Sequence, residues 1–317
     1  MIRAWISDAS GPREATAEEA VRRALGESPC GVWVDIDCED AGARRALEPL
    51  GIHPLVLEDM VRELNRPKVD NYGDYIYLVL HSARWDEDRP TLREIDFVVG
   101  RNYLVTYHDG ESRSIQAAHE ALPRRPDLLS RGPAPLLHFI LDVLVDHYLP
   151  IMDRIGEEID ALEESVFDDR RPLDHHRVIG LKRGMSALRR IVGPQRDTVL
   201  ALTRDEFKPI PPDLRPYLRD VYDRMARVTD LLDSFRDESA TVLELHLTMA
   251  SNRLNEVIKR LTVMATVGLP LTVITSYYGM NFALPEYKWA WGWVYALGLM
   301  VASAVGTLAY LRRKGWW

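Results

Sequence analysis

Residues 261–280 read LTVMATVGLPLTVITSYYGM and contain no charged side chain. An α-helix rises about 1.5 Å per residue, so this stretch would be about 30 Å long, which matches the hydrocarbon core of a membrane. A second uncharged stretch, WAWGWVYALGLMVASAVGTLAYL, follows at residues 289–311. Helices in the core of a soluble protein rarely extend this far without a charge. The sequence therefore predicts a hairpin of two membrane-spanning helices.

Basic residues flank the hairpin at both of its ends. Lys259 and Arg260 precede the first stretch, and RRK at residues 312–314 follows the second. Because lysine and arginine favour the cytoplasmic side, both chain termini are predicted to lie in the cytoplasm, with the connector at residues 282–288 outside. The first residues contain no apolar segment typical of a cleaved secretory signal. We expect a multi-pass protein of the cell (inner) membrane, in contact with the lipid bilayer.

Composition limits the function of the protein. The whole chain has 40 Lys+Arg against 48 Asp+Glu and a formal net charge of -8, and 46% of its residues are hydrophobic. This hydrophobic content excludes a disordered chain. The acidic balance argues against a nucleic-acid partner, which requires a basic face. The two cysteines, Cys30 and Cys38, lack the spacing of a zinc ribbon or a disulfide scaffold.

The sequence before the hairpin predicts an α+β cytoplasmic domain followed by long stalk helices. Residues 1–131 are expected to form the α/β domain. Strands are predicted, from β-branched and aromatic enrichment, at residues 31–37, 75–81, 94–99 and 103–107. Residues 132–212 are expected to be helical, with one helix over 136–168 and another over 173–203, weakened at Gly193-Pro194.

A long stalk helix is predicted over residues 213–260. Apolar residues recur there at alternating four- and three-residue steps, which gives a heptad-like seam that includes Val221, Met225, Val228 and Leu232. The stalk continues without a linker into the first span, residues 261–281. The external loop (282–288), the second span (289–311) and a basic, aromatic tail (312–317) complete the expected organisation.

The outer end of the first span carries the most informative motif, Gly279-Met280-Asn281. A backbone carbonyl and a neutral amide suit a Mg²⁺ ion that keeps its water shell, and conduction needs sites that bind weakly. Pro270 removes a backbone hydrogen bond in the middle of this span, which lipid cannot replace. We therefore expect the first span to lie inside an assembly. Two spans cannot enclose a pore, so several copies are needed.

Seven segments carry a resemblance to a known family. They are residues 278–282 (YGMNF), 255–262 (NEVIKRLT), 270–272 (PLT), 218–223 (LRDVYD), 235–237 (FRD), 53–59 (HPLVLED) and 66–69 (RPKV). Together they span nearly the whole chain, and the sequence closely resembles the CorA family of divalent-metal channels. The resemblance implies a funnel-shaped homopentamer whose pore is lined by five copies of the first span.

The resemblance also implies roles for individual residues. Gly279, Met280 and Asn281 would form the selectivity filter. The pore and its gate would be lined by Thr272, Leu269, Leu261 and Ile258. Leu269 stands where the family usually has Met, so the constriction would be less deformable. The regulatory Mg²⁺ sensor would use Asp220 and Asp142, with one acid contributed by a neighbouring copy from Asp86, Glu87 and Asp88.

The expected function is Mg²⁺ influx, driven by the membrane potential and closed by intracellular Mg²⁺ bound between subunits. Co²⁺ and Ni²⁺ are possible further cargo, because the sequence does not separate hydrated divalent ions of similar size. The alternative is a Zn²⁺ transporter of the related ZntB type, whose members typically replace Met280 of the motif. A membrane-anchored scaffold that conducts no ions is a further alternative. It would need no polar residues inside the span, so the polar residues present there argue against it. We expect no enzyme, since nucleophile, base and orienting group are not found together.

Overall fold

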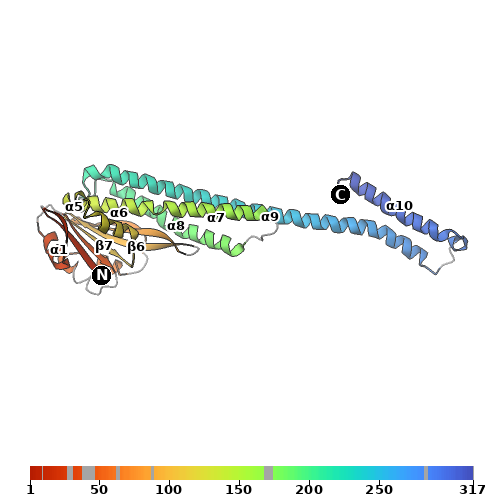
Figure 1. The fold of residues 1–317 in the computed structure, drawn as a ribbon, viewed down its shortest axis with the longest axis horizontal. Helices are drawn as coiled ribbons and strands as arrows, with labels where there is room; N and C mark the ends of the chain where they lie inside the picture. The colour runs from red at the N-terminus through yellow and green to blue at the C-terminus, as the bar shows by residue number, and fades with distance from the viewer. Residues whose placement is uncertain are drawn as a thin grey trace. The chain divides into compact units, whose positions relative to one another are not determined.

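The computed structural model describes residues 1–8, 10–26, 31–37, 47–61, 65–86, 89–167, 174–281 and 285–316. The chain divides into two compact units, Met1–Val242 and Leu243–Trp317. The first unit contains a mixed β-sheet with long helices, and the second contains the two apolar helices (Figure 1).

A seven-stranded sheet in the order β2-β1-β3-β7-β6-β5-β4 organises the first unit. Neighbouring strands are antiparallel, except β3 and β7, which are parallel. The strands are β1 (Ile2–Asp8), β2 (Gly11–Ala15), β3 (Val32–Asp37), β4 (Lys68–Asn71), β5 (Tyr75–Asp86), β6 (Arg89–Gly100) and β7 (Tyr103–His108). The four predicted strands are confirmed as parts of β3, β5, β6 and β7.

Helices cover both faces of the sheet, because alternate residues of the central strands are apolar on each side. One face buries Val34, Val105, Val98 and Tyr77 in a core shared with α1 (Ala17–Ala24), η1 (Glu48–Leu50) and α3 (Pro54–Asp59). The other face buries Trp33, on which His119 of α4 (Arg113–Ala121) stacks with a centroid separation of 4.2 Å. Short α5 (Asp127–Ser130) packs beside α6.

The predicted helix over residues 136–168 was wrong, because the structure has two helices there. These are α6 (Ala134–Asp146) and α7 (Leu149–Phe167). Pro150 has no N–H with which to bond the carbonyl of Asp146, so the helix breaks just before it. Between the two helices, the fully buried Tyr148 donates its hydroxyl to the carbonyl of His81 at 2.7 Å. The turn thus fixes the helices against β5.

The remaining long helices are α8 (His175–Leu202) and α9 (Arg215–Tyr278), with the short 3-10 turn η2 (Pro212–Leu214) before α9. The weak point predicted at Gly193-Pro194 does not interrupt α8, which continues through Pro194. The predicted seam of α9 is confirmed where Val221, Met225, Val228 and Leu232 are buried in the first unit. An ion pair of 2.5 Å between Arg189 and Asp233 joins α8 to α9.

The second unit exposes its apolar side chains. The last part of α9 and helix α10 (Gly292–Arg313) are both long and apolar enough to cross a membrane. The segment Ala134–Phe167 also meets this criterion, but half of its most apolar stretch is buried, against 6% in each of the other two helices. The buried fraction therefore identifies Ala134–Phe167 as a core segment of the first unit. The other two helices have apolar surfaces that must be covered by something else, such as lipid or further copies of the chain.

A buried carboxyl group lies on the sheet face covered by α3. Asp96 of β6 accepts a hydrogen bond of 2.6 Å from the hydroxyl of Tyr77 of β5. Burial raises the pKa of Asp96 to about 8, and the nearby carboxylate of Glu94 adds to this rise. The folded protein therefore holds a proton on Asp96 at pH values where the unfolded chain has released it.

Asp96 predicts a pH dependence of stability. Its folded pKa lies above the value of 3.8 for an unperturbed aspartate, so its stabilising contribution is full below pH 3.8 and is lost as the pH rises through about 8. The slope is at most about 1.4 kcal/mol per pH unit. Asp96→Asn keeps an acceptor for Tyr77 and removes the proton. Thermal unfolding should therefore depend less on pH in Asp96→Asn than in the parent between about pH 5 and about pH 8.

Two buried histidines also make stability depend on pH. The effect of Asp96 is therefore measured as the difference between the pH profiles of the parent and of Asp96→Asn. Burial lowers the pKa of His81 to about 4, so its contribution is lost as the pH falls. Burial also opposes the charging of His108, but the Asp35 carboxylate raises its pKa overall, so its contribution is lost as the pH rises. Both remain in Asp96→Asn. Identical pH profiles for parent and variant would show that Asp96 is ionised in the folded protein.

Candidate functional site

The predicted filter residues lie where α9 ends. Tyr278 is the last helical residue, and the N–H of Gly279 bonds the carbonyls of Thr275 at 2.9 Å and Ser276 at 3.2 Å. Gly279, Met280 and Asn281 are all exposed. The last carbonyls of a helix lack backbone partners within the helix. This helix end therefore offers neutral carbonyl and amide oxygens to solvent, and it contains no charged group.

Threonines that precede the motif in α9 donate their hydroxyl protons to backbone carbonyls of the same helix. Thr272 donates to the carbonyl of Gly268 at 3.0 Å, Thr266 to Thr262 at 2.7 Å and Thr262 to Ile258 at 2.8 Å. Each hydroxyl oxygen keeps its lone pairs for an outside donor such as water. Pro270 lies inside α9 and has no N–H, so the carbonyl of Thr266 lacks the helical bond that residue 270 would otherwise donate.

The predicted pore and gate residues share one side of α9. At 3.6 residues per turn, four of them fall within about 80° of one another around the helix axis. They are Ile258, Leu261, Leu269 and Thr272. The three apolar members are between 50% and 66% exposed. One side of the helix thus presents apolar side chains followed by a hydroxyl side chain, and the described residues of the chain leave this side exposed.

Two of the predicted sensor carboxylates meet at an arginine that sequence reasoning missed. Arg224 of α9 pairs with Asp220 at 3.2 Å on its own helix and with Asp142 and Asp146 of α6, the latter at 2.6 Å. Burial opposes ionisation of Arg224, but these carboxylates raise its pKa overall. The spacing i,i+4 of Asp220 and Arg224 could have indicated this pair. The contact between α6 and α9 could not be read from periodicity.

The third predicted acid has other partners. Asp86, at the end of β5, pairs with Arg84 at 2.9 Å and accepts a hydrogen bond of 2.8 Å from Thr91 of β6. Glu87 and Asp88 lie outside the described residues. Across the described ranges of the chain, no group of three or more His, Cys, Asp or Glu side chains is arranged to hold a metal ion. Asp86 and Asp220 thus have different charged partners within the described residues.

The connector residues 285–288 pack closely on the start of α10. A turn, η3 (Pro285–Lys288), precedes α10, and a cavity of about 440 Å³ between them is lined partly by Tyr278, Trp289 and Trp293. One carboxylate oxygen of Glu286 is buried there without a hydrogen-bond partner among the described residues. A Cβ placed at Gly292 would lie 2.4 Å from the carbonyl oxygen of Glu286. Gly292 thus permits the close approach of the connector.

The Gly292→Ala substitution should displace the connector, because a backbone oxygen cannot move aside as a flexible side chain can. We expect the thermal unfolding midpoint in detergent to fall, by an amount equivalent to about 1–3 kcal/mol. Gly306→Ala is the matched control, since an added Cβ there meets nothing within 4 Å in the chain. Equal midpoints for the two variants would contradict the close packing at Gly292.

Comparisons with known proteins agree on one family. The family model described as CorA-like Mg²⁺ transporter protein matches residues 31–313. The putative metal ion transporter YfjQ of Bacillus subtilis is 32% identical, over 90% of this chain and 89% of its own length. The cobalt/magnesium transport protein CorA of Thermotoga maritima is 34% identical, over 86% of this chain and 79% of its own length.

Structural comparison agrees on the fold. The CorA magnesium transporter from Methanocaldococcus jannaschii superposes with a TM-score of 0.86 at 21% identity, covering 100% of this chain and 99% of the other. The zinc transport protein ZntB of Yersinia enterocolitica matches over 98% of this chain and 94% of its own length but at 23% identity, lower than that of the two relatives above.

Proposed function

This chain belongs to the family of CorA-like Mg²⁺ transporter proteins and is a divalent-metal transporter of the membrane, and we propose that it acts as a homopentameric Mg²⁺ channel. Mg²⁺ enters the cell through it, driven by the membrane potential. The α/β unit and both chain termini lie in the cytoplasm, residues 261–281 and 289–311 cross the membrane, and residues 282–288 face outward.

One observation carries this proposal, namely the uncharged oxygens at the outer end of α9. Between Arg260 and Glu286 the chain has no acidic or basic side chain, and the exposed Gly279, Met280 and Asn281 complete this stretch. Mg²⁺ gives up its waters reluctantly. Neutral carbonyl and amide oxygens can hold its water shell without binding it so tightly that conduction stops.

Five copies of α9 around one axis would cover the side of the helix that a single chain leaves exposed. Asn281 and the carbonyl of Gly279 then form the outer ring, and Thr272 forms a hydroxyl ring within the membrane. Leu269, Leu261 and Ile258 form the narrow apolar section, which closes by excluding water. Their exposure in the single chain supports this arrangement.

Closure by intracellular Mg²⁺ involves the carboxylates around Arg224. In the structure Arg224 pairs with Asp142, Asp146 and Asp220, one positive charge against three negative charges, and Asp220 remains 71% exposed at its side chain. A divalent ion between Asp220 and one acid of a neighbouring copy, from Asp86, Glu87 and Asp88, would relieve repulsion between their charges. Mg²⁺ bound there would hold neighbouring copies together and keep the pore shut.

Co²⁺ and Ni²⁺ would pass by the same route, because hydrated divalent ions of similar size meet the same oxygens. Zn²⁺ transport of the ZntB type is the alternative. Met280 in the middle of the motif supports Mg²⁺ over Zn²⁺, and so does the higher identity to a cobalt/magnesium transport protein.

Ion uptake into liposomes that contain the purified protein distinguishes between these ions. Uptake of Mg²⁺, Co²⁺, Ni²⁺ and Zn²⁺ should be measured in parallel at an inside-negative potential, with protein-free liposomes as the control. We expect Mg²⁺ uptake that rises with the potential and needs no ATP. Zn²⁺ uptake without Mg²⁺ uptake would replace the proposal by the zinc alternative.

A further inference from the structure

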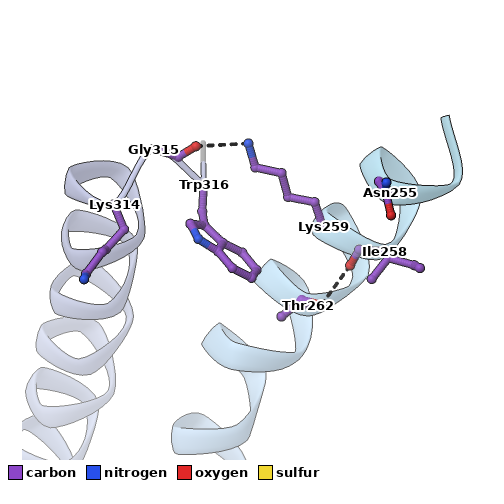
Figure 2. A pocket seen from close by; sticks show the side chains of 7 residues that line it. All are labelled: Asn255, Ile258, Lys259, Thr262, Lys314, Gly315 and Trp316. Atoms are coloured by element: carbon purple, nitrogen blue, oxygen red, sulfur yellow. Dashed lines mark hydrogen bonds between the residues drawn. The ribbon is translucent and has the colours of Figure 1, made fainter. Parts of the chain in front are cut away.

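A pocket of about 310 Å³ lies beside the start of the apolar part of α9, within the second unit (Figure 2). Asn255, Lys259 and Thr262 of α9 line it on one side, and Lys314 and Trp316 line it on the other. In Figure 2 the indole of Trp316 lies between the two helices. The two segments are far apart in sequence but meet at the same level of the hairpin.

The end of α10 builds this pocket through its backbone. Gly315 has φ +73°, a left-handed conformation that glycine adopts without strain. The N–H of Trp316 then bonds the carbonyl of Leu311 at 3.0 Å, which ends the helix. The carbonyl of Gly315 is left to accept a hydrogen bond of 3.0 Å from the ammonium of Lys259 (Figure 2).

Among the described residues, two lysines and no acidic side chain line the pocket. An ammonium group has three donors, and the carbonyl of Gly315 takes one of those on Lys259. Within the described part of the chain, Lys314 makes no ion pair. The nearest acid along α9, Glu256, does not line the pocket and pairs with Arg260 at 3.5 Å. The pocket therefore suits an anion that accepts hydrogen bonds.

Apolar surface continues from the pocket along α10. Tyr310, one helical turn before Lys314, is 61% exposed, and tryptophan is typical of the level where headgroups meet hydrocarbon. A soluble anion would use only the lysines. A phospholipid would use the lysines through its phosphate and the apolar surface through its acyl chains.

We propose that this pocket binds the phosphate headgroup of an anionic phospholipid in the cytoplasmic leaflet. Lys259 contacts the phosphate, Lys314 adds positive charge beside it, and Trp316 packs against the glycerol and the first part of the acyl chains. Basic pockets between spanning helices on the cytoplasmic side are suited to such headgroups. The inference requires that both helices cross a membrane and does not depend on which ion the chain transports.

Binding of phosphatidylglycerol to the purified full-length protein tests this inference, with phosphatidylcholine as the zwitterionic comparison. Lipid retention can be measured by native mass spectrometry in detergent. The double variant Lys259→Gln/Lys314→Gln should bind phosphatidylglycerol roughly 30-fold more weakly and phosphatidylcholine unchanged. Arg312→Gln/Arg313→Gln removes the same charge from neighbouring residues that do not line the pocket, and it should lose clearly less affinity.

Two results would overturn the inference. One is equal loss of phosphatidylglycerol binding in the two double variants, which would show a general charge effect with no site. The other is competition by inorganic phosphate as effective as that by phosphatidylglycerol, which would assign the pocket to a soluble anion. The oligomeric state of each variant, measured in the same spectra, shows whether it has kept its assembly.

Discussion

Asn281→Ala should abolish the preference of the transporter for Mg²⁺ over other cations and reduce Mg²⁺ uptake into proteoliposomes more than tenfold. Each copy loses one amide that accepts hydrogen bonds from the water shell of the ion, and one such bond contributes about 1 kcal/mol. Because five copies would lose it at the same ring, the losses accumulate. The exposed position of Asn281, just beyond the end of α9, makes this loss a local one.

Asn252→Ala is the control for that experiment, since Asn252 is another exposed asparagine of α9 but precedes the apolar stretch. Its uptake should match that of the parent. Mg²⁺ uptake and ion preference unchanged in Asn281→Ala would show that the outer ring is formed by other groups.

Asp220→Ala should raise the internal Mg²⁺ concentration needed for closure by about tenfold, the effect of losing one charged ligand worth about 1.5 kcal/mol. The exposed carboxylate of Asp220 extends from the group held by Arg224, where a neighbouring copy could reach it. Uptake by the open channel should not change, because Asp220 lies in the first unit and Asn281 in the second. The measurement is Mg²⁺ uptake as internal Mg²⁺ is varied.

Asp223→Ala provides a matched control for Asp220. Asp223 is on the same helix, is 63% exposed at its side chain and pairs only weakly with Arg219, at 3.7 Å. Its removal should leave the closing concentration unchanged. An equal shift in the two variants would indicate a general effect of surface charge, and no shift in Asp220→Ala would remove Asp220 from the sensor.

Hydropathy and local propensity were sufficient for the central strands and for the apolar helices. The strands that the sequence did not reveal lie mainly at the edges of the sheet. Both β2 (GPREA) and β4 (KVDN) are short and polar, as edge strands often are. The break between α6 and α7 could have been read from Pro150, which was outweighed by the continuous apolar periodicity around it.

The candidate site was predictable to the extent that it is local in sequence. Gly279-Met280-Asn281 follows directly from the end of an apolar helix, whereas Arg224 became visible only when α6 and α9 were brought together. Asp86 and Asp220 have different partners within one chain. A site made between copies leaves no periodicity in a single sequence, and for this reason the sensor remains a prediction.

Electrical recording from the purified protein in a planar bilayer, with Mg²⁺ as the only permeant cation, tests the conduction pathway most directly. We expect a Mg²⁺ current that depends on voltage and that disappears when Mg²⁺ is raised on the cytoplasmic side. Protein that is inserted in the bilayer and carries no Mg²⁺ current at any voltage, with cytoplasmic Mg²⁺ removed, would contradict the account.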